Sequence, residues 1–214
     1  MRLGNAGRFR PVARAGVIAS SMALMAMVVS PNAAFAATVI GSATGAVTCG
    51  SGFDTVQVAT SSGTYVVPAG GGDITSWSTQ AGPLAGPVGL QVWRPTITAQ
   101  TYQLVGASPL VTLTTSTVNT INLATPIAVQ AGDLLGLRIE GRAYCGQFTS
   151  SATDVWGSMM GLNPAVGVTD LFSYSTFFQL DVAATVGPAV TPPPPPSAGC
   201  DFSGSFTGEQ ICEQ

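Results

Sequence analysis

Short runs of alternating apolar and polar residues constrain this chain most strongly, because glycine or proline ends each run before a helix of ordinary length is complete. In one run, Leu135, Leu137 and Ile139 would lie on one face of an extended strand. Arg138 and Glu140 would lie on the opposite face. Beyond residue 36, no window of helical length keeps a period of about 3.6 residues without meeting Gly or Pro. The pattern therefore predicts short β-strands.

The predicted strands are rich in Thr and Val, which favour extended backbone, and most have one polar face. They cover residues 55–58, 64–67, 74–81, 88–94, 102–105, 110–113, 118–123, 127–130, 134–140, 146–149 and 178–182. Strands of this kind pair in antiparallel sheets that bury the apolar face and leave the polar face in solvent. The sequence therefore predicts an all-β fold, an antiparallel two-sheet sandwich that is jelly-roll-like.

Residues 150–174 interrupt this pattern. The segment is rich in Gly, Ser and Met and carries the large side chains of Trp156 and Phe172. No strand is readable in it, so we predict a long irregular loop. Loops of this length in compact domains are often functional or disordered.

The N-terminus has the three parts of a secretory signal. Four arginines lie within the first 14 residues, an apolar stretch covers residues 15–29, and Ala34-Phe35-Ala36 fits a cleavage site. A membrane-spanning helix needs about 20 apolar residues, more than this stretch provides. We therefore predict that residues 1–36 are a signal peptide, that the mature protein begins at Ala37, and that it is secreted into the extracellular space.

Composition divides the mature chain into three parts. Residues 37–188 are long enough for one domain with its own core, and we assign the β-sandwich to them. Residues 189–198 form a Pro-rich linker, in which five consecutive prolines favour a stiff polyproline II spacer of about 15 Å. Residues 199–214 form a tail that is too short for a core of its own. We predict that this Pro-rich C-terminal region is disordered.

Removal of the signal changes the charge balance. The mature chain keeps three Arg and no Lys or His against ten acidic residues, which gives a net charge of −7. Neutralising phosphates requires clustered Arg or Lys, so the composition argues against nucleic acid as a partner and against an anionic membrane surface. No later segment is apolar over a length that spans a bilayer, so we predict no membrane span after signal removal.

All four cysteines lie in the exported part, and an even number of cysteines in an oxidising compartment indicates disulfides. Sequence alone leaves all three connectivities open. The most economical one pairs Cys49 with Cys145 and Cys200 with Cys212. In the chain-entropy account, the longer loop contributes up to about 4.7 kcal/mol and the shorter one about 3 kcal/mol. Zinc would require close Cys pairs or His ligands, and neither is present, so we predict no metal.

Three sequence segments stand out in the predicted domain: VPAGGGDITSWS at residues 67–78, LQVWRP at 90–95, and PIAVQAGDLLGL at 126–137. They resemble a loose group of uncharacterised secreted bacterial β-sandwich proteins. The resemblance covers most of residues 45–185 and does not extend to the tail. It implies a β-sandwich fold and export. The group carries no established activity, so the resemblance implies no catalytic residue and no cofactor.

The residue types of the chain restrict its chemistry. Without His there is no Ser-His or Cys-His pair, and without Lys there is no Schiff base and no P-loop. Asp54-Thr55 begins like an aspartic-protease loop, but Val56 stands where that motif has Gly, and no second copy exists. Glu140, the one Glu of the predicted domain, is expected to be exposed and solvated. We therefore predict no catalytic residue, no cofactor and no enzyme activity.

Two glycine-containing segments are predicted to be turns. Gly132 supplies an unusual φ between two predicted strands, and Asp133 caps the turn. A calcium ligand at Asp133 is the alternative, but no run of alternating Asp or Asn follows. Residues 70–72 are three glycines, which we interpret as a flexible connection because neither a helix nor a Lys follows.

Aromatic residues are the candidates for ligand contact. Trp77 and Trp93 lie within predicted strands, where burial is expected, although Trp93 alternates to the face opposite Leu90. Trp156 lies in the predicted irregular segment, and Tyr144 lies before it. If Trp93, Tyr144 and Trp156 met on one concave surface, they would form a site for a sugar ring.

Three functions fit these observations. The first is a secreted, non-enzymatic β-sandwich with a structural or protein-interaction role at or outside the cell envelope, with an envelope protein as a partner. The second is a carbohydrate-binding module whose ligand is a glycan. The third is a hydrolase that uses carboxylates alone. We favour the first, because His and Lys are missing and because a fold does not by itself imply an activity.

Overall fold

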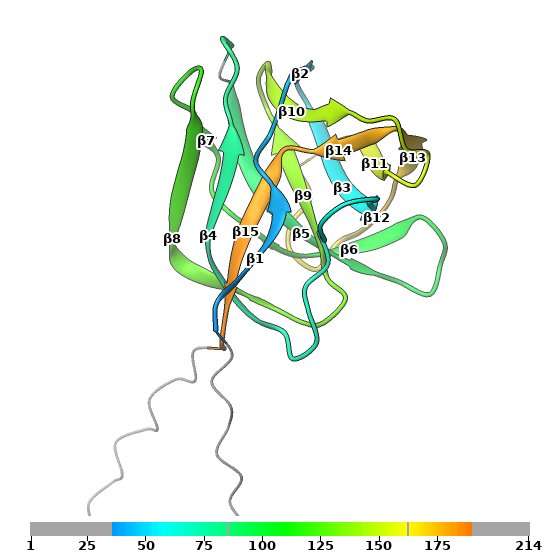
Figure 1. Ribbon diagram of the computed structural model, residues 1–214. Coiled ribbons are helices and arrows are strands. Elements are labelled where there is room, and N and C mark those ends of the chain that lie inside the picture. Colours follow the sequence, from blue (N-terminus) through cyan, green and yellow to red (C-terminus); the bar gives the residue numbers. More distant parts are fainter. Residues whose placement is uncertain (1–35, 85, 162, 190–214) are drawn as a thin grey trace, which may run out of the picture. The chain divides into compact units, whose positions relative to one another are not determined.

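A computed structural model describes residues 36–84, 86–161 and 163–189. All regular elements in these residues are β-strands, and all strand pairs are antiparallel (Figure 1). This confirms the predicted all-β, antiparallel character, but the strands form three sheets where the sequence predicted two. The predicted signal peptide up to residue 35 and the predicted linker and tail from residue 190 onward lie outside the described residues.

The four-stranded sheet contains, in spatial order, β1 (Thr38–Ser42), β15 (Val182–Gly187), β4 (Gly72–Gln80) and β8 (Val118–Val129). The sequence predicted two strands, at residues 118–123 and 127–130 on either side of Pro126, where the structure has the single strand β8. The pairing of β8 with β4 shifts register between Ile74 and Ser76, which places Pro126 in the irregular part of the ladder. The missing N–H of the proline is tolerated there because no regular ladder hydrogen bond is required.

The eight-stranded sheet runs β12 (Thr169–Leu171), β6 (Thr101–Ala107), β5 (Pro87–Pro95), β9 (Leu134–Ile139), β3 (Phe53–Ala59), β11 (Val155–Met160) and β13 (Ser173–Thr176), with β7 (Val111–Thr112) also paired to β5. Its two end strands, β12 and β13, are separated in sequence by Phe172 alone. The sheet therefore curls into a half-barrel that brings its two ends together (Figure 1).

The three-stranded sheet contains β14 (Phe178–Leu180), β10 (Ala143–Phe148) and β2 (Val47–Cys49). The Cys49–Cys145 disulfide links β2 to the neighbouring strand β10, which confirms this predicted pairing. The other predicted pair, Cys200 with Cys212, lies outside the described residues.

The prediction of an irregular loop over residues 150–174 is wrong, because the segment contains β11, β12 and the start of β13. Both faces of β11 are covered, so its sequence shows no simple alternation of apolar and polar residues. Gly157 of β11 is packed closely, since a Cβ atom there would lie 3.0 Å from both Phe172 and Val56. Conversely, residues 64–67, which were predicted to be a strand, form only an isolated antiparallel β-bridge between Val66 and Leu134.

Two apolar cores lie on opposite faces of the eight-stranded sheet. One core, shared with the four-stranded sheet, contains Leu135, Leu137 and Ile139 together with Trp77. The other fills the half-barrel and is made of Val56, Trp93, Tyr102, Leu104, Leu134 and Phe172. The expectation that the second face of each strand would be solvated is therefore wrong for the central strands of this sheet.

Two buried aspartates anchor the junctions between sheets. Asp181, between β14 and β15, accepts hydrogen bonds from the Gln80 amide at 3.0 Å and from the Thr79 hydroxyl at 3.1 Å. Burial raises the pKa of Asp181 to about 6, although these hydrogen bonds lower it in part. Burial also acts to raise the pKa of Asp154, but hydrogen bonds from neighbours that include Ser61 and Gln179 outweigh it and bring the pKa to about 2.

The raised pKa of Asp181 predicts that stability falls as the pH rises from about 4 to about 6. Between these values the folded chain holds a proton that the unfolded chain has lost, so the stabilisation is full below about pH 4 and is lost as the pH passes the folded pKa. The loss is at most about 3 kcal/mol. In urea unfolding at several pH values, Asp181→Asn should flatten this dependence, apart from a remainder due to Asp54, whose pKa burial also raises.

Asp154→Asn is the matched control, because the Asp154 carboxyl, with a folded pKa of about 2 and an ordinary pKa of 3.8, has lost its proton in both states above about pH 5. It should leave the slope between about pH 5 and 6.5 unchanged. An Asp181→Asn protein with the slope of the natural protein would contradict the assignment.

Candidate functional site

The three aromatic residues proposed as ligand contacts do not meet on one surface. Trp93 is fully buried inside the half-barrel, where its ring packs edge-on against Phe172 at a centroid distance of 4.8 Å. Trp156 belongs to the core on the opposite face of the sheet and is half-buried, with its ring 4.7 Å from that of Phe178. Tyr144 lies on β10 in the three-stranded sheet, against Gly82.

The two predicted turns have the expected geometry. Gly132 has φ near +90°, and the Asp133 carboxylate accepts a hydrogen bond from the Gln130 amide at 2.8 Å. The same carboxylate binds the Arg94 guanidinium through two hydrogen bonds of 2.8 and 2.9 Å. Residues 70–72 all have positive φ and lead into β4. Asp133 is therefore engaged by the turn and by Arg94.

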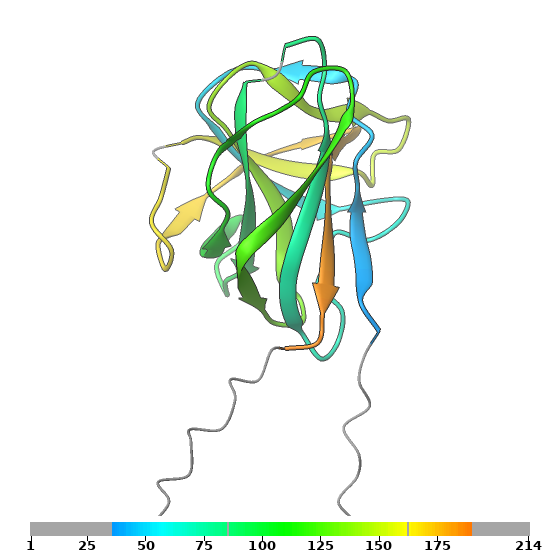
Figure 2. The same ribbon diagram turned by 90° about the vertical axis from the view of Figure 1, so that its left-hand side faces the viewer.

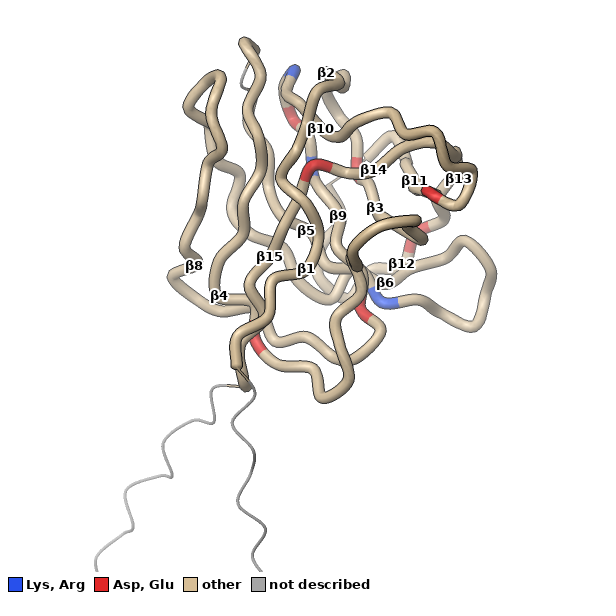
Figure 3. Tube along the Cα trace, viewed as in Figure 1, with Lys and Arg blue, Asp and Glu red and all other residues tan. Residues whose placement is uncertain are grey.

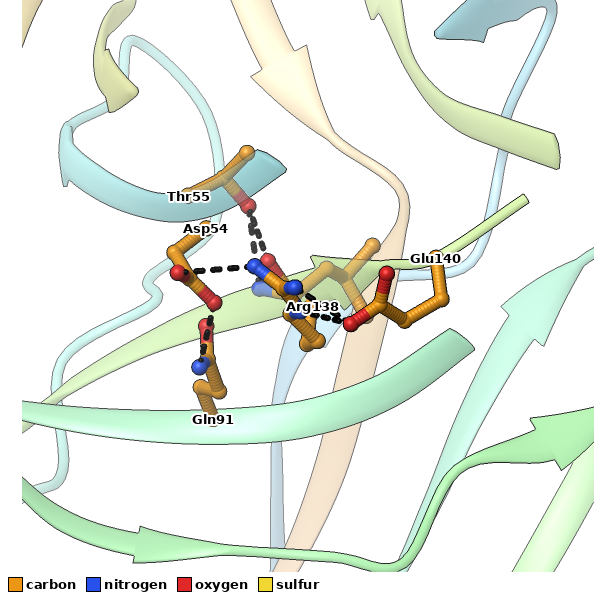
Figure 4. Close-up of polar contacts among 6 residues, drawn as sticks. Asp54, Thr55, Gln91, Arg138 and Glu140 are labelled. Atoms are coloured by element: carbon orange, nitrogen blue, oxygen red, sulfur yellow. Dashed lines mark hydrogen bonds and ion pairs between the residues drawn. The ribbon is translucent and has the colours of Figure 1, made fainter. Parts of the chain in front are cut away.

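A cluster of carboxylates around Arg138 is the most concentrated group of ionisable side chains in the described residues (Figure 4). Arg138 on β9 donates to the Asp54 carboxylate on β3 at 3.0 Å and, through Nε, to Glu140 at 2.9 Å. Asp54 also accepts a hydrogen bond from the Gln91 side chain on β5 at 2.7 Å. The side chains of this cluster thus connect β3, β5 and β9 through hydrogen bonds and ion pairs.

The cluster is closed to solvent on most sides. The Asp54 side chain is fully buried, and that of Arg138 is 7 % exposed. The backbone of Gly161 covers the pair so closely that a Cβ atom there would lie 1.8 Å from the Asp54 carboxylate. The Glu140 side chain is 30 % exposed and paired with Arg138, so the expectation of an exposed, solvated carboxylate at Glu140 is wrong. Both carboxylates are therefore bound by Arg138.

Thr55 explains why β3 and β9 separate beside this cluster. Their ladder consists of two residue pairs, and next to it the Thr55 hydroxyl bonds both the carbonyl and the amide of Leu137, at 2.9 and 3.0 Å. A hydroxyl that satisfies both backbone groups replaces a ladder hydrogen bond. Gly136 lies where the strands cross, since a Cβ atom there would lie 1.9 Å from the Thr55 carbonyl oxygen.

The other charged residues are spread along the described chain, as Figure 3 shows. Arg94 is bound by Asp133, while Asp154 and Asp181 accept hydrogen bonds from neighbouring backbone and side-chain groups. In residues 36–189, leaving out 85 and 162, no three His, Cys, Asp or Glu side chains are grouped to hold a metal ion. Most of these ionisable groups are therefore engaged in holding the fold.

An open groove lies between strand β6 and the edge strand β8, which lies on the side of the ribbon that faces the viewer in Figure 2. It consists of two adjoining hollows of about 550 and 390 Å³ that share Val105, Ala128 and Val166. We call it the β6–β8 groove. β8 is the last strand of its sheet. β12 and the two residues before it pair with β6 as far as Leu104, so the edge of β6 borders the groove only from Val105 to Ala107.

The floor of the β6–β8 groove is aliphatic and tightly packed. Ile127 of β8 packs directly on Gly106 of β6, where a Cβ atom would lie 2.2 Å from its side chain. Leu104 and Val129 are buried beneath the first hollow, while Val166 stands 61 % exposed at the rim. Gly106 is therefore required for the two strands to approach each other.

The lining of the groove combines aliphatic side chains and glycine with the uncharged polar side chains of Gln103, Ser108, Thr125 and Gln130. None of the described residues that line it is aromatic, and Asp73 and Arg94 are its only ionisable groups. Arg94 is already bound by Asp133, and Asp73 also has an interaction within the fold. Such a surface offers aliphatic contacts and strand edges, and no nucleophile with a base beside it.

Sequence reasoning did not identify this groove. Its two walls come from segments that lie about twenty residues apart and belong to different sheets. The available signal was Gly106, which directly follows the predicted strand at residues 102–105, since a glycine beside or within a strand marks a bulge or a close approach of another backbone.

Comparisons of the chain with protein-family models, curated proteins and solved structures find no match. In the described ranges, no helix is long and apolar enough to cross a membrane. The function is therefore argued from the geometry of the site alone.

The Arg138 cluster predicts a large loss of stability when its cation is removed. Arg138→Met leaves Asp54 buried without its charge partner, which should lower the free energy of unfolding by about 3 kcal/mol or more. The double variant Arg138→Met, Asp54→Asn should recover part of that loss, because no buried charge remains. Arg142→Met, at an exposed position four residues away, is the control and should change stability by about 0.5 kcal/mol or less in the same urea titrations.

Proposed function

We propose that this protein is a secreted, non-enzymatic interaction module that binds an extended polypeptide segment in the β6–β8 groove. The observation that carries the proposal is the groove itself: an aliphatic hollow bordered by the edges of β6 and β8, with no aromatic residue and no free ionisable group among the described residues that line it. Exposed strand edges and aliphatic pockets are features by which proteins recognise extended peptides.

Pro126 restricts how a peptide can bind. It lies on the β8 edge in the wall of the groove and has no N–H to offer. A continuous added strand along β8 is therefore disfavoured, because prolines on edge strands block strand addition. The favoured ligand is an extended or polyproline II segment held chiefly by apolar contacts.

The disulfide supports the proposed secretion, and the sheet arrangement supports the proposed sandwich fold. A Cys49–Cys145 bond fits an oxidising compartment outside the cytoplasm, in agreement with the predicted signal peptide. A jelly-roll-like sandwich is the fold we propose, with the four-stranded and eight-stranded sheets as its two layers and the three-stranded sheet at one end.

The carbohydrate-binding alternative has less support. Sugar sites use exposed aromatic faces beside polar groups, whereas Trp93 is buried and Trp156 packs on Phe178 on the other face of the sheet. A glycan array probed with the mature protein tests this alternative. Binding that is lost in Trp156→Ala would favour it over the groove.

Selection of peptides from a random library displayed on phage tests the groove. Selected peptides should bind the mature protein with micromolar Kd. Ala128→Asp should weaken them about tenfold or more, because Ala128 lines both hollows and the new carboxylate would be buried under the peptide.

Val118→Asp is the control, because this exposed residue lies on the same strand outside the groove. It should leave the Kd unchanged. Selected peptides that bind equally well to the Ala128→Asp protein would exclude the groove as the binding site.

A further inference from the structure

The described chain ends at the mouth of the β6–β8 groove. Ala189 lines the larger hollow, together with Gly72 and Gln130. Strand β15 delivers the chain to this point, since its last residue, Gly187, pairs with Asp73 in the wall of the same hollow. Twenty-five residues follow Ala189 in the sequence. The C-terminal segment therefore starts beside the site for which we have proposed a peptide ligand.

We propose that residues 190–196 of the same molecule occupy the β6–β8 groove, so that the protein covers its own binding site. This inference rests on the proposed function, because it names the segment that the groove takes in the free protein. An outside partner then binds by displacing this segment.

The length of the segment matches the length of the groove. The β8 wall from Leu123 to Gln130 covers seven residue steps, which is about 23 Å at roughly 3.3 Å per residue. From Ala189 to residue 196, which is also seven residue steps, a polyproline II conformation would cover about 22 Å at roughly 3.1 Å per residue. The chain must reverse direction to enter the groove, and Gly187 and Pro188, which precede the segment, are residue types typical of turns.

The chemistry of the segment matches the lining. Residues 190–196 read VTPPPPP, which contains no ionisable group and five residues without an N–H. The groove offers aliphatic side chains and a β8 edge interrupted by Pro126. This edge cannot form a continuous hydrogen-bond ladder, so a ligand without N–H groups loses little by binding there. A preformed polyproline II segment also loses little conformational entropy when it binds.

Covalent attachment makes even weak binding effective. A segment tethered by a few residues is present at an effective concentration in the millimolar range. An intrinsic Kd of about 0.1 mM then keeps the groove about nine-tenths occupied in the isolated molecule. A free peptide at micromolar concentration competes against this occupancy.

Photo-cross-linking in the full mature protein tests the proposal. With p-benzoylphenylalanine in place of Ala128, irradiation should link position 128 to a peptide that contains residues 190–196, within a monomer. The same group in place of the exposed Val118 should not form this link. Absence of the link at position 128, or a link found only between two molecules, would overturn the proposal.

Peptide affinity separates this inference from the proposed function. Replacement of all five prolines at 192–196 by Ser should make the groove-selected phage peptides bind about tenfold tighter, because it weakens the internal competitor. Equal affinity for both chains would overturn the self-occupancy and leave the peptide-binding function standing. Failure to select any peptide sensitive to Ala128→Asp, even with the serine variant, would instead overturn the proposed function.

Discussion

The meeting of the two ends of the eight-stranded sheet at Phe172 is the constraint on which the rest of the structure depends. Because β12 and β13 flank this one residue, the sheet must curl, and its inner face becomes a second core. Phe172 fills that core with edge-on contacts to Trp93 and Tyr102. The curl places polar residues of the central strands inward, where Asp54 accepts hydrogen bonds from Gln91 and Arg138 and the side-chain oxygen of Gln91 has no partner. The buried ion pair is thus a consequence of sheet closure.

The same closure limits what the molecule presents to solvent. Carboxylates that would be available for chemistry on an open sheet are paired inside the half-barrel or at the junctions between sheets. The groove between β6 and β8 lies where the curled sheet and the four-stranded sheet leave strand edges uncovered. The β6–β8 groove contains strand edges and aliphatic side chains, and these features suit the recognition of an extended polypeptide segment.

The sequence predicted the elements whose determinants are local. The alternation in β5 and β9 and the turn at Gly132 were readable, because they depend on period two and on backbone φ. The Cys49–Cys145 pairing was the most economical of three connectivities that the sequence left open. The curl was not readable, because covering both faces of β11 removes the alternation that marks a strand. The burial of Gln57, whose amide bonds backbone groups of β11 and β14, also depends on contacts about a hundred residues away in sequence. The β6–β8 groove was not predicted either, because its two walls come from separate segments of different sheets.

The pairing of β1 with β15 has a mechanical consequence. The two strands are antiparallel, with Thr38 opposite Val186, so both ends of the domain leave from the same end of one hydrogen-bonded pair (Figure 1). A force that pulls these ends apart loads the hydrogen bonds one after another, as in a zipper, and each opens before the next bears load. Peeling from the N-terminal side then meets the Cys49–Cys145 bond, a covalent stop. Tension on that side would release about a dozen residues before the disulfide bears the load, whereas the residues after Cys145 lie outside the loop that this bond closes.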